Sequence, residues 1–268
     1  MFMVVAVEDK KEPLRQRLGR LLRGDALEWE ERSCGGNRYR YVVWHGPAER
    51  LPWGRLALLC PRPRSPVLLP PEVLAPEGCP LRDYRPQDFT ARLTVAAARQ
   101  AMEQTAGKGS GLLGLLDPQG IAPWACGEWL DCCRGVKGYT LRRSRYAAAE
   151  TMLRVEYGLP LLWAETPAEL EDCSICAAPY PTGVIRVRRP IITADRSGIQ
   201  GNPTVNRLTL ALTPEQLAEV PPGAEPTAFW GMVTECGTRR VKLPLTLGGC
   251  RIDGRLAEFT ELGKLMRT

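Results

Sequence analysis

The stretch GLLGLLDPQGIAPWACGEWL, residues 111–130, decides the fold of this chain. An apolar run ends at Asp117, the chain turns over the next three residues, and apolar sequence then resumes. A near-continuous apolar run before a turn is typical of a parallel strand that is buried on both faces. We therefore predict a strand over 112–117, a turn, and a helix over about 122–134.

Strand and helix patterns alternate after this stretch. A strand is predicted over 138–143, and a helix follows from Ser144 until Gly158 ends it. Three further apolar segments are predicted as strands: 159–165, 173–179 and 183–190. Strand–helix repetition of this kind specifies an α/β fold with a doubly wound, mostly parallel sheet.

The order of elements from 112 to 190 resembles the Rossmann superfamily. The resemblance implies that a dinucleotide would lie across the turn after the first strand, where backbone N–H groups approach its pyrophosphate. In this turn only Gly120 matches the glycine-rich pattern of the superfamily. Pro118 and Pro123 each lack an N–H donor, and Asp117 brings a negative charge close to the phosphates. We therefore expect a degenerate fingerprint that disfavours the usual dinucleotide pose.

The second predicted strand ends in two arginines, Arg142 and Arg143, and Arg145 follows them. The resemblance implies that an acidic residue at this place grips the ribose of NAD, whereas an arginine accepts the 2′-phosphate of NADP. A solvated basic strand end is the alternative explanation. The candidate cofactor-binding residues are Asp117, Gly120, Arg142 and Arg143.

Other chemically active residues give no motif. His45 is the only histidine, so a Ser-His-Asp or Cys-His mechanism would depend on it, and a turn residue is its ordinary explanation. CSIC, residues 173–176, has no second Cys pair to complete a zinc site, and we expect the ten cysteines to be free, packed thiols. AGKGSG, residues 106–111, lacks the Walker spacing and is interpreted as a hinge. No catalytic residue is assigned, and no metal is expected.

A smaller α/β domain precedes the Rossmann-like one. Residues 61–87 are proline-rich and are interpreted as a connector, so we predict domains over 1–87 and 88–268. The second domain is expected to begin with a long helix from Asp88 and to end in a helical or irregular extension. The first domain is expected to contain a helix within 12–24 and strands over 2–8, 26–31, 38–44 and 55–61.

Composition limits the possible partners. The 268 residues are 44% apolar and 25% charged, as in ordinary globular proteins, and the net charge of +6 is spread along the chain. No apolar stretch has the length of a membrane span, and the N-terminus lacks the pattern of a signal peptide, so we expect a cytoplasmic protein. Nucleic-acid contact through 141–145 and 186–190 is a weaker alternative, because aromatic side chains do not alternate with these arginines.

Two functional hypotheses follow from these observations. The first is a non-catalytic or regulatory protein that binds a small metabolite or a protein partner, with no cofactor. The alternative is an oxidoreductase-like or other nucleotide-dependent enzyme with a divergent, NADP-type phosphate site, in which Asp117 acts as a polar anchor or base. The oligomeric state is not indicated by the sequence.

Overall fold

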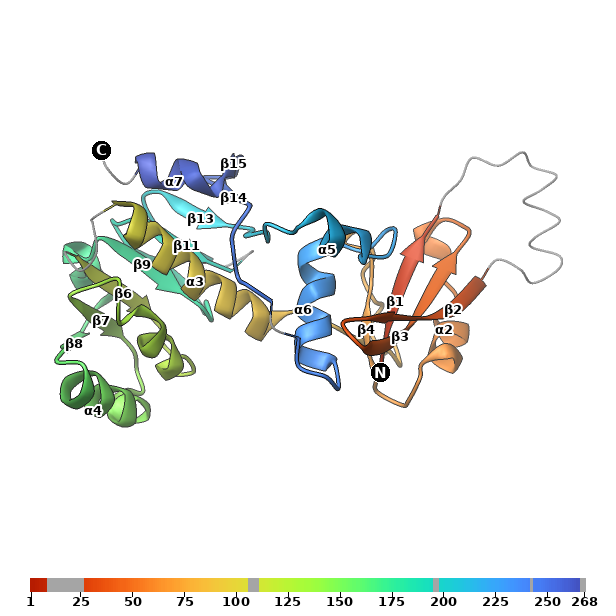
Figure 1. The fold of residues 1–268 in the computed structure, drawn as a ribbon, viewed down its shortest axis with the longest axis horizontal. Helices are drawn as coiled ribbons and strands as arrows, with labels where there is room; N and C mark the ends of the chain where they lie inside the picture. The colour runs from red at the N-terminus through yellow and green to blue at the C-terminus, as the bar shows by residue number, and fades with distance from the viewer. Residues whose placement is uncertain (9–26, 106–110, 195–197, 242, 266–268) are drawn as a thin grey trace. The chain divides into compact units, whose positions relative to one another are not determined.

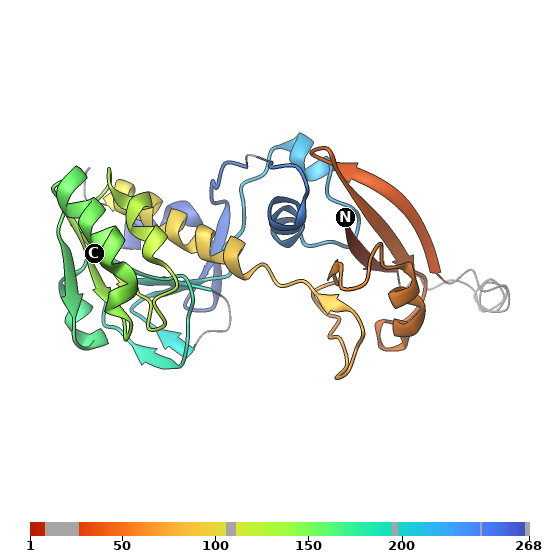
Figure 2. The same cartoon turned by 90° about the horizontal axis from the view of Figure 1, so that it is seen from below.

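The chain divides into two compact units, each with its own sheet, in a computed structural model (Figures 1 and 2). Unit 1 comprises Met1–Pro86 and Leu212–Pro244, and unit 2 comprises Gln87–Ala211 and Leu245–Thr268. The predicted helix within 12–24 lies outside the described residues, as does most of the predicted hinge. The structure describes residues 1–8, 27–105, 111–194, 198–241 and 243–265.

Unit 2 is built on an eight-stranded sheet, in which six neighbouring strands are parallel in the order β8-β7-β6-β9-β11-β13 (Figure 1). Numbered along the chain, this order is 3-2-1-4-5-6, which is the Rossmann order. The predicted doubly wound α/β fold is therefore confirmed. The strands are β6(Leu112–Leu116), β7(Gly135–Tyr139), β8(Leu161–Ala164), β9(Ile175–Ala178), β11(Ile191–Thr193), β13(Thr204–Asn206), and the antiparallel β14(Gly249–Ile252) and β15(Arg255–Glu258).

The central strand β6 is buried along its whole length because both faces of the sheet are covered. Helix α3 packs on β9 and β11 and touches the 3-10 helix η2, which in turn touches α4 (Figure 2). The other face carries the 3-10 helix η4 and a small sheet of β10 and β12. These elements are α3(Gln87–Thr105), η2(Pro123–Trp129), η3(Arg143–Tyr146), α4(Ala147–Glu156), η4(Pro167–Asp172), β10(Val184–Arg186), β12(Gly198–Gln200) and α7(Phe259–Leu265).

Four predicted features of unit 2 differ from the structure. The extension expected to be helical or irregular at its end supplies β13, β14 and β15 to the main sheet. The helix expected over about 122–134 is the short 3-10 helix η2, in which Gly127 lowers the helix propensity at the middle of the segment. Strand β7 ends at Tyr139 rather than at residue 143, since its register with β6 places Tyr139 opposite Leu116, the last residue of β6. The strand expected over 183–190 is only three residues long and pairs with β12 outside the main sheet.

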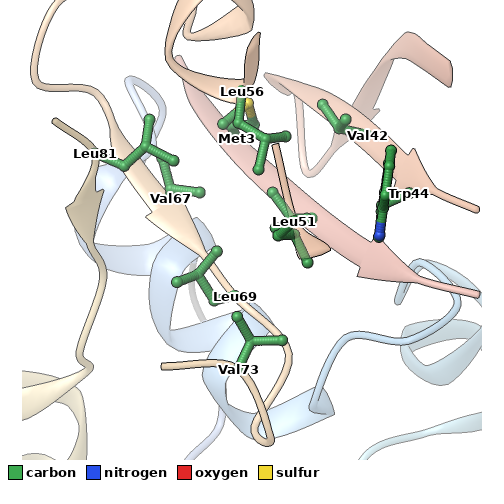
Figure 3. Packing of buried hydrophobic residues seen from close by; sticks show 10 residues of the cluster. Met3, Val42, Trp44, Leu51, Leu56, Val67, Leu69, Val73 and Leu81 are labelled. Atoms are coloured by element: carbon green, nitrogen blue, oxygen red, sulfur yellow. The ribbon is translucent and has the colours of Figure 1, made fainter. Parts of the chain in front are cut away.

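Unit 1 contains a five-stranded sheet in the order β2-β3-β1-β4-β5. β1 pairs in parallel with β3 and β4, and β2 joins β3 as an antiparallel edge strand. Figure 3 shows the apolar cluster on this sheet, where Met3, Val42 and Val67 come from three neighbouring strands. The strands are β1(Phe2–Val7), β2(Leu27–Cys34), β3(Asn37–Trp44), β4(Pro66–Leu68) and β5(Arg82–Asp83).

The strand predicted over 55–61 is wrong, because this segment forms most of helix α2(Trp53–Leu59) after the 3-10 turn η1(Ala48–Arg50). Leu56 is fully buried, whereas Leu58 is 85% exposed. Short apolar runs fit a strand and a buried helix equally well, so the pattern alone does not distinguish them.

The segment Leu212–Pro244 packs in unit 1, although the sequence placed it in the second domain. It carries α5(Pro214–Ala218) and α6(Pro226–Cys236). The ring of Phe229 meets that of Tyr39 edge-on, with centroids 5.6 Å apart. An apolar helix such as α6 must be covered, but its sequence does not say which sheet covers it.

In the described part of the chain, every helix is too short or too polar to traverse a lipid bilayer.

Replacing Gly114 at the centre of β6 by alanine should destabilise unit 2. The added Cβ would lie 2.6 Å from Sγ of Cys176 and 3.3 Å from Sγ of Cys173, both of which are buried. Overpacking of this kind costs about 1–3 kcal/mol, so we expect a lower urea midpoint than in the wild type. Gly127→Ala is the control, because its added Cβ would meet no atom closer than 3.7 Å. Equal midpoints for the two variants would contradict this packing.

Candidate functional site

The turn after β6 is closed by the side chain of Asp117. Asp117 is fully buried, and its Oδ2 accepts hydrogen bonds from the backbone N–H of Ala122 at 2.7 Å and from the hydroxyl of Tyr146 at 2.6 Å. A buried carboxylate needs such donors because it has lost its water. Asp117 therefore serves the turn itself, and its carboxylate does not reach the surface.

Most backbone N–H groups of the turn are bonded within the protein. The N–H of Asp117 donates to the carbonyl of Tyr139 at 3.0 Å, and that of Gly120 donates to the carbonyl of Asp117 at 3.1 Å. The N–H of Ala122 is held by the Asp117 carboxylate, and Pro118 has none. In a Rossmann site these groups face a pyrophosphate. Here they do not form a free cradle for one.

The hydroxyl of Tyr146 is a buried partner of this carboxylate. Burial and the neighbouring Asp117 raise the pKa of Tyr146 well above its ordinary value, since both disfavour a phenolate. Its ring meets the ring of Trp163 edge-on, with centroids 5.3 Å apart. The other carboxylate oxygen, Oδ1 of Asp117, is buried without a hydrogen-bond partner in the described part of the chain.

Gly120 is required where the turn meets the segment after β7. Its φ is +66°, which favours glycine, and an added Cβ would lie 2.8 Å from Cβ of Arg142 and 3.1 Å from Cδ of Arg145. The backbone N–H of Leu141 also donates to the carbonyl of Pro118 at 3.1 Å. The turn and the arginine segment thus form one surface at the carboxyl edge of the sheet.

The arginines after β7 differ in what they contact. Arg142 is exposed, and its guanidinium forms no ion pair or hydrogen bond with any described residue. Arg143 donates to Glu165 at 2.7 Å and lies over the ring of Trp163, 5.6 Å from its centroid. Nη1 of Arg145 donates to the carbonyl oxygens of Gln119 and Gly120, at 3.4 and 3.5 Å. The structure therefore brings Gly120 and Arg142 together, whereas Arg143 is paired elsewhere and Asp117 is buried beneath.

A second polar group at this edge was missed by the sequence analysis. Tyr180 follows β9, the strand beside β6, and its hydroxyl donates to Asp88 at 2.9 Å. Burial, and then the Asp88 carboxylate, raise the pKa of Tyr180 to about 12. The chain order of the parallel strands reverses between β6 and β9, and open α/β sheets bind ligands at this point. The available signal was the position of Tyr180 just after a buried strand.

The other residues that the sequence singled out, His45 and the cysteine pair at 173 and 176, make their contacts elsewhere. His45 belongs to unit 1, where its ring nitrogens lie 3.5 Å from a carboxylate oxygen of Glu8 and 3.3 Å from one of Glu28. Cys173 and Cys176 are buried in the core of unit 2 as free thiols. Among the residues whose placement is described, no group of three or more His, Cys, Asp or Glu side chains is arranged to hold a metal ion.

Comparisons with known proteins give only distant structural likenesses. No family model and no curated protein matches the chain. It is similar to the Delta(1)-pyrroline-2-carboxylate reductase of Thermococcus litoralis, solved with NADH and L-proline, with 20% identity over 40% of this chain and 36% of that one and a TM-score of 0.30. The L-tryptophan dehydrogenase of Nostoc punctiforme is 11% identical over 75% of this chain and 61% of its own, also at 0.30. The chain spans less than two thirds of either protein.

Tyr146→Phe should destabilise unit 2, because it removes a buried donor from the Asp117 carboxylate. Loss of a hydrogen bond to a buried polar group costs about 1–3 kcal/mol, which urea unfolding will measure. Tyr157→Phe is the control, since Tyr157 is half-exposed and its hydroxyl has no hydrogen bond with the described residues. Equal losses in the two variants would contradict the role of Tyr146.

The raised pKa of Tyr146 predicts how this difference changes with pH. The folded state favours the neutral hydroxyl of Tyr146. The contribution of this hydroxyl to the free energy of unfolding is therefore complete below the ordinary tyrosine pKa of about 10 and decreases as the pH rises above it. The wild type should therefore lose stability more steeply than Tyr146→Phe above pH 10. Parallel curves for the two proteins in that range would contradict the shift.

Proposed function

We propose that unit 2 binds a phosphate-bearing nucleotide of the NADP type at the carboxyl edge of β6 and β7. The observation that supports this most directly is the guanidinium of Arg142, which is exposed, has no described partner, and lies beside Gly120. In the Rossmann order this position, just after the second strand, is where an arginine accepts a ribose 2′-phosphate.

The residues fit one half of such a nucleotide better than the other. A pyrophosphate would need free N–H groups in the turn, but those of Asp117, Gly120 and Ala122 are already bonded. A 2′-phosphate needs only an accessible guanidinium, which binds its oxygens through paired N–H donors. We therefore place the main phosphate contact at Arg142, with Arg145 as its neighbour on the same surface.

When bound, a nicotinamide nucleotide supplies hydride transfer, and this chain's own residues supply binding and orientation. Tyr180 could hold a proton at its hydroxyl oxygen next to Asp88, because its pKa is raised to about 12. Asp117 is not the exposed base that the sequence suggested, since its carboxylate is bonded to Tyr146 inside the turn.

A non-catalytic or regulatory role is the second candidate function. It is favoured by the internal bonding of the groups at this edge that could exchange protons, Asp117 with Tyr146 and Tyr180 with Asp88. In this case the same edge binds a small metabolite or a partner protein, and the turn keeps its shape without a cofactor.

Arg142→Ala should abolish the stabilisation of the chain by NADP⁺. A ligand at 100 times its Kd stabilises the folded state by about 2.7 kcal/mol, so the wild-type Tm should rise by several degrees. Alanine keeps the Cβ that packs beside Gly120 and removes only the guanidinium. Arg154→Ala is the matched control, because it removes an exposed arginine of α4. No rise with NADP⁺ in the wild type would exclude the nucleotide site and leave the second candidate.

Glu165→Gln should strengthen NADP⁺ binding, because it releases Arg143 from an ion pair of 2.7 Å. Arg143 follows Arg142 directly in the chain, so its freed guanidinium can bind the 2′-phosphate together with that of Arg142. We expect a several-fold lower Kd for NADP⁺ and no change for NAD⁺, measured by calorimetry. Equal changes for both nucleotides would show that the effect does not depend on the 2′-phosphate.

A further inference from the structure

Two neighbouring cavities of unit 2 lie at the amino edge of its sheet, opposite the site described above. One has a volume of about 840 Å³ and is lined by Ser174, Pro190 and Pro203, which directly precede β9, β11 and β13. The other has a volume of about 660 Å³ and shares Arg188 and Asn202 with the first. We call the two together the amino-edge recess, and each has the size of a small-molecule site.

Four arginines line the amino-edge recess, and the guanidinium groups of two of them have no partner among the described residues. Arg188 lies 3.4 Å from a carboxylate oxygen of Glu171, and Arg189 donates to the backbone carbonyl of the same residue. The guanidinium groups of Arg186 and Arg255 form no ion pair or hydrogen bond with any part of the chain that the structure describes. These two groups are available to a ligand.

The carboxylates of the recess do not cancel this charge. Glu171 is matched by Arg188, and Asp253 accepts a hydrogen bond from the backbone N–H of Thr204 at 2.9 Å. Glu261 is the third carboxylate in the lining. A hydrogen bond from a neutral N–H leaves the charge of Asp253 in place, so the four arginines of the lining face three carboxylates. The remaining positive charge favours an anionic ligand.

The backbone of residues 186–189 is held in place by hydrogen bonds before any ligand binds to the recess. The backbone N–H of Val187 donates to the carbonyl of Gln200 at 2.8 Å, and that of Asn202 donates to the carbonyl of Arg189 at 3.0 Å. The side chain of Val187 is buried in the core between two exposed arginines, Arg186 and Arg188. A fixed backbone reduces the entropy that is lost when side chains close on a ligand.

We propose that the amino-edge recess binds a small metabolite with two or more phosphate groups, held by Arg186 and Arg255. A guanidinium presents parallel N–H donors that match the oxygens of a phosphate. The side-chain amide of Asn202, which lines both cavities, adds a neutral donor. None of the lining residues is aromatic, so the recess lacks the stacking surface of a single-stranded nucleic-acid site.

The test is calorimetric titration of the full chain with inorganic pyrophosphate at low ionic strength. The double variant Arg186→Ala/Arg255→Ala should raise the Kd by about tenfold or more, because it removes two charge-assisted contacts. Arg154→Ala, which removes an exposed arginine elsewhere in unit 2, should leave the Kd unchanged. Glu261→Gln should lower the Kd several-fold, since it removes an opposing carboxylate.

Several results would overturn the proposal. Equal Kd values for the wild type and the double variant would exclude the recess, and loss of pyrophosphate binding in Arg142→Ala alone would place the anion at the carboxyl edge. Citrate binding as tight as pyrophosphate binding would exclude recognition of phosphate. Tighter binding of single-stranded RNA than of pyrophosphate, lost in the same double variant, would identify a nucleic-acid surface instead. The double variant keeps Arg142, so its stabilisation by NADP⁺ separates failure of this proposal from failure of the carboxyl-edge site.

Discussion

The carboxylate of Asp117 is the constraint on which the candidate site of unit 2 depends. It lies inside the turn after β6 and joins the backbone of Ala122 to the hydroxyl of Tyr146, which is the last residue of η3 and precedes α4. A buried carboxylate with only part of its hydrogen-bonding capacity used is costly, so these donors must stay in place. The turn is thus stabilised by an anion that belongs to the protein.

This internal anion changes what the carboxyl edge can bind. In the Rossmann fold the positive charge at the end of the first strand comes from backbone N–H groups and a helix N-terminus. Here η2 is a short 3-10 helix, and the N–H groups of Asp117, Gly120 and Ala122 are bonded to a carbonyl of β7, to the Asp117 carbonyl and to the Asp117 carboxylate. The side chains of Arg142 and its neighbours carry positive charge there instead, and our proposal therefore assigns phosphate recognition to the end of the second strand rather than the first.

The sequence predicted the α/β class of unit 2 and the positions of β6, β8 and β9 through one local feature, the alternation of buried strands with helical segments, whereas β11 and β13 were not predicted. The capping box of α5 at Thr213 and Gln216, both of whose hydrogen bonds form, is likewise a local feature, because it depends on residues three apart. Contacts between distant segments were not predictable, and they include the burial of Asp117 by Tyr146 and the ion pair of Arg143 with Glu165. For the same reason α6 was assigned to the wrong unit.

The two edges of the unit 2 sheet show why a count of arginines does not define a site. RVRRP, residues 186–190, and LRRSR, residues 141–145, look alike in sequence. In each segment some guanidinium groups are neutralised by a nearby acid, Arg188 by Glu171 and Arg143 by Glu165. Exposed ion pairs of this kind are worth about 0–1 kcal/mol, and a paired guanidinium gains less from a ligand by that amount because the ion pair must first break. The residues that matter are therefore the unpaired ones, and only the folded chain distinguishes them.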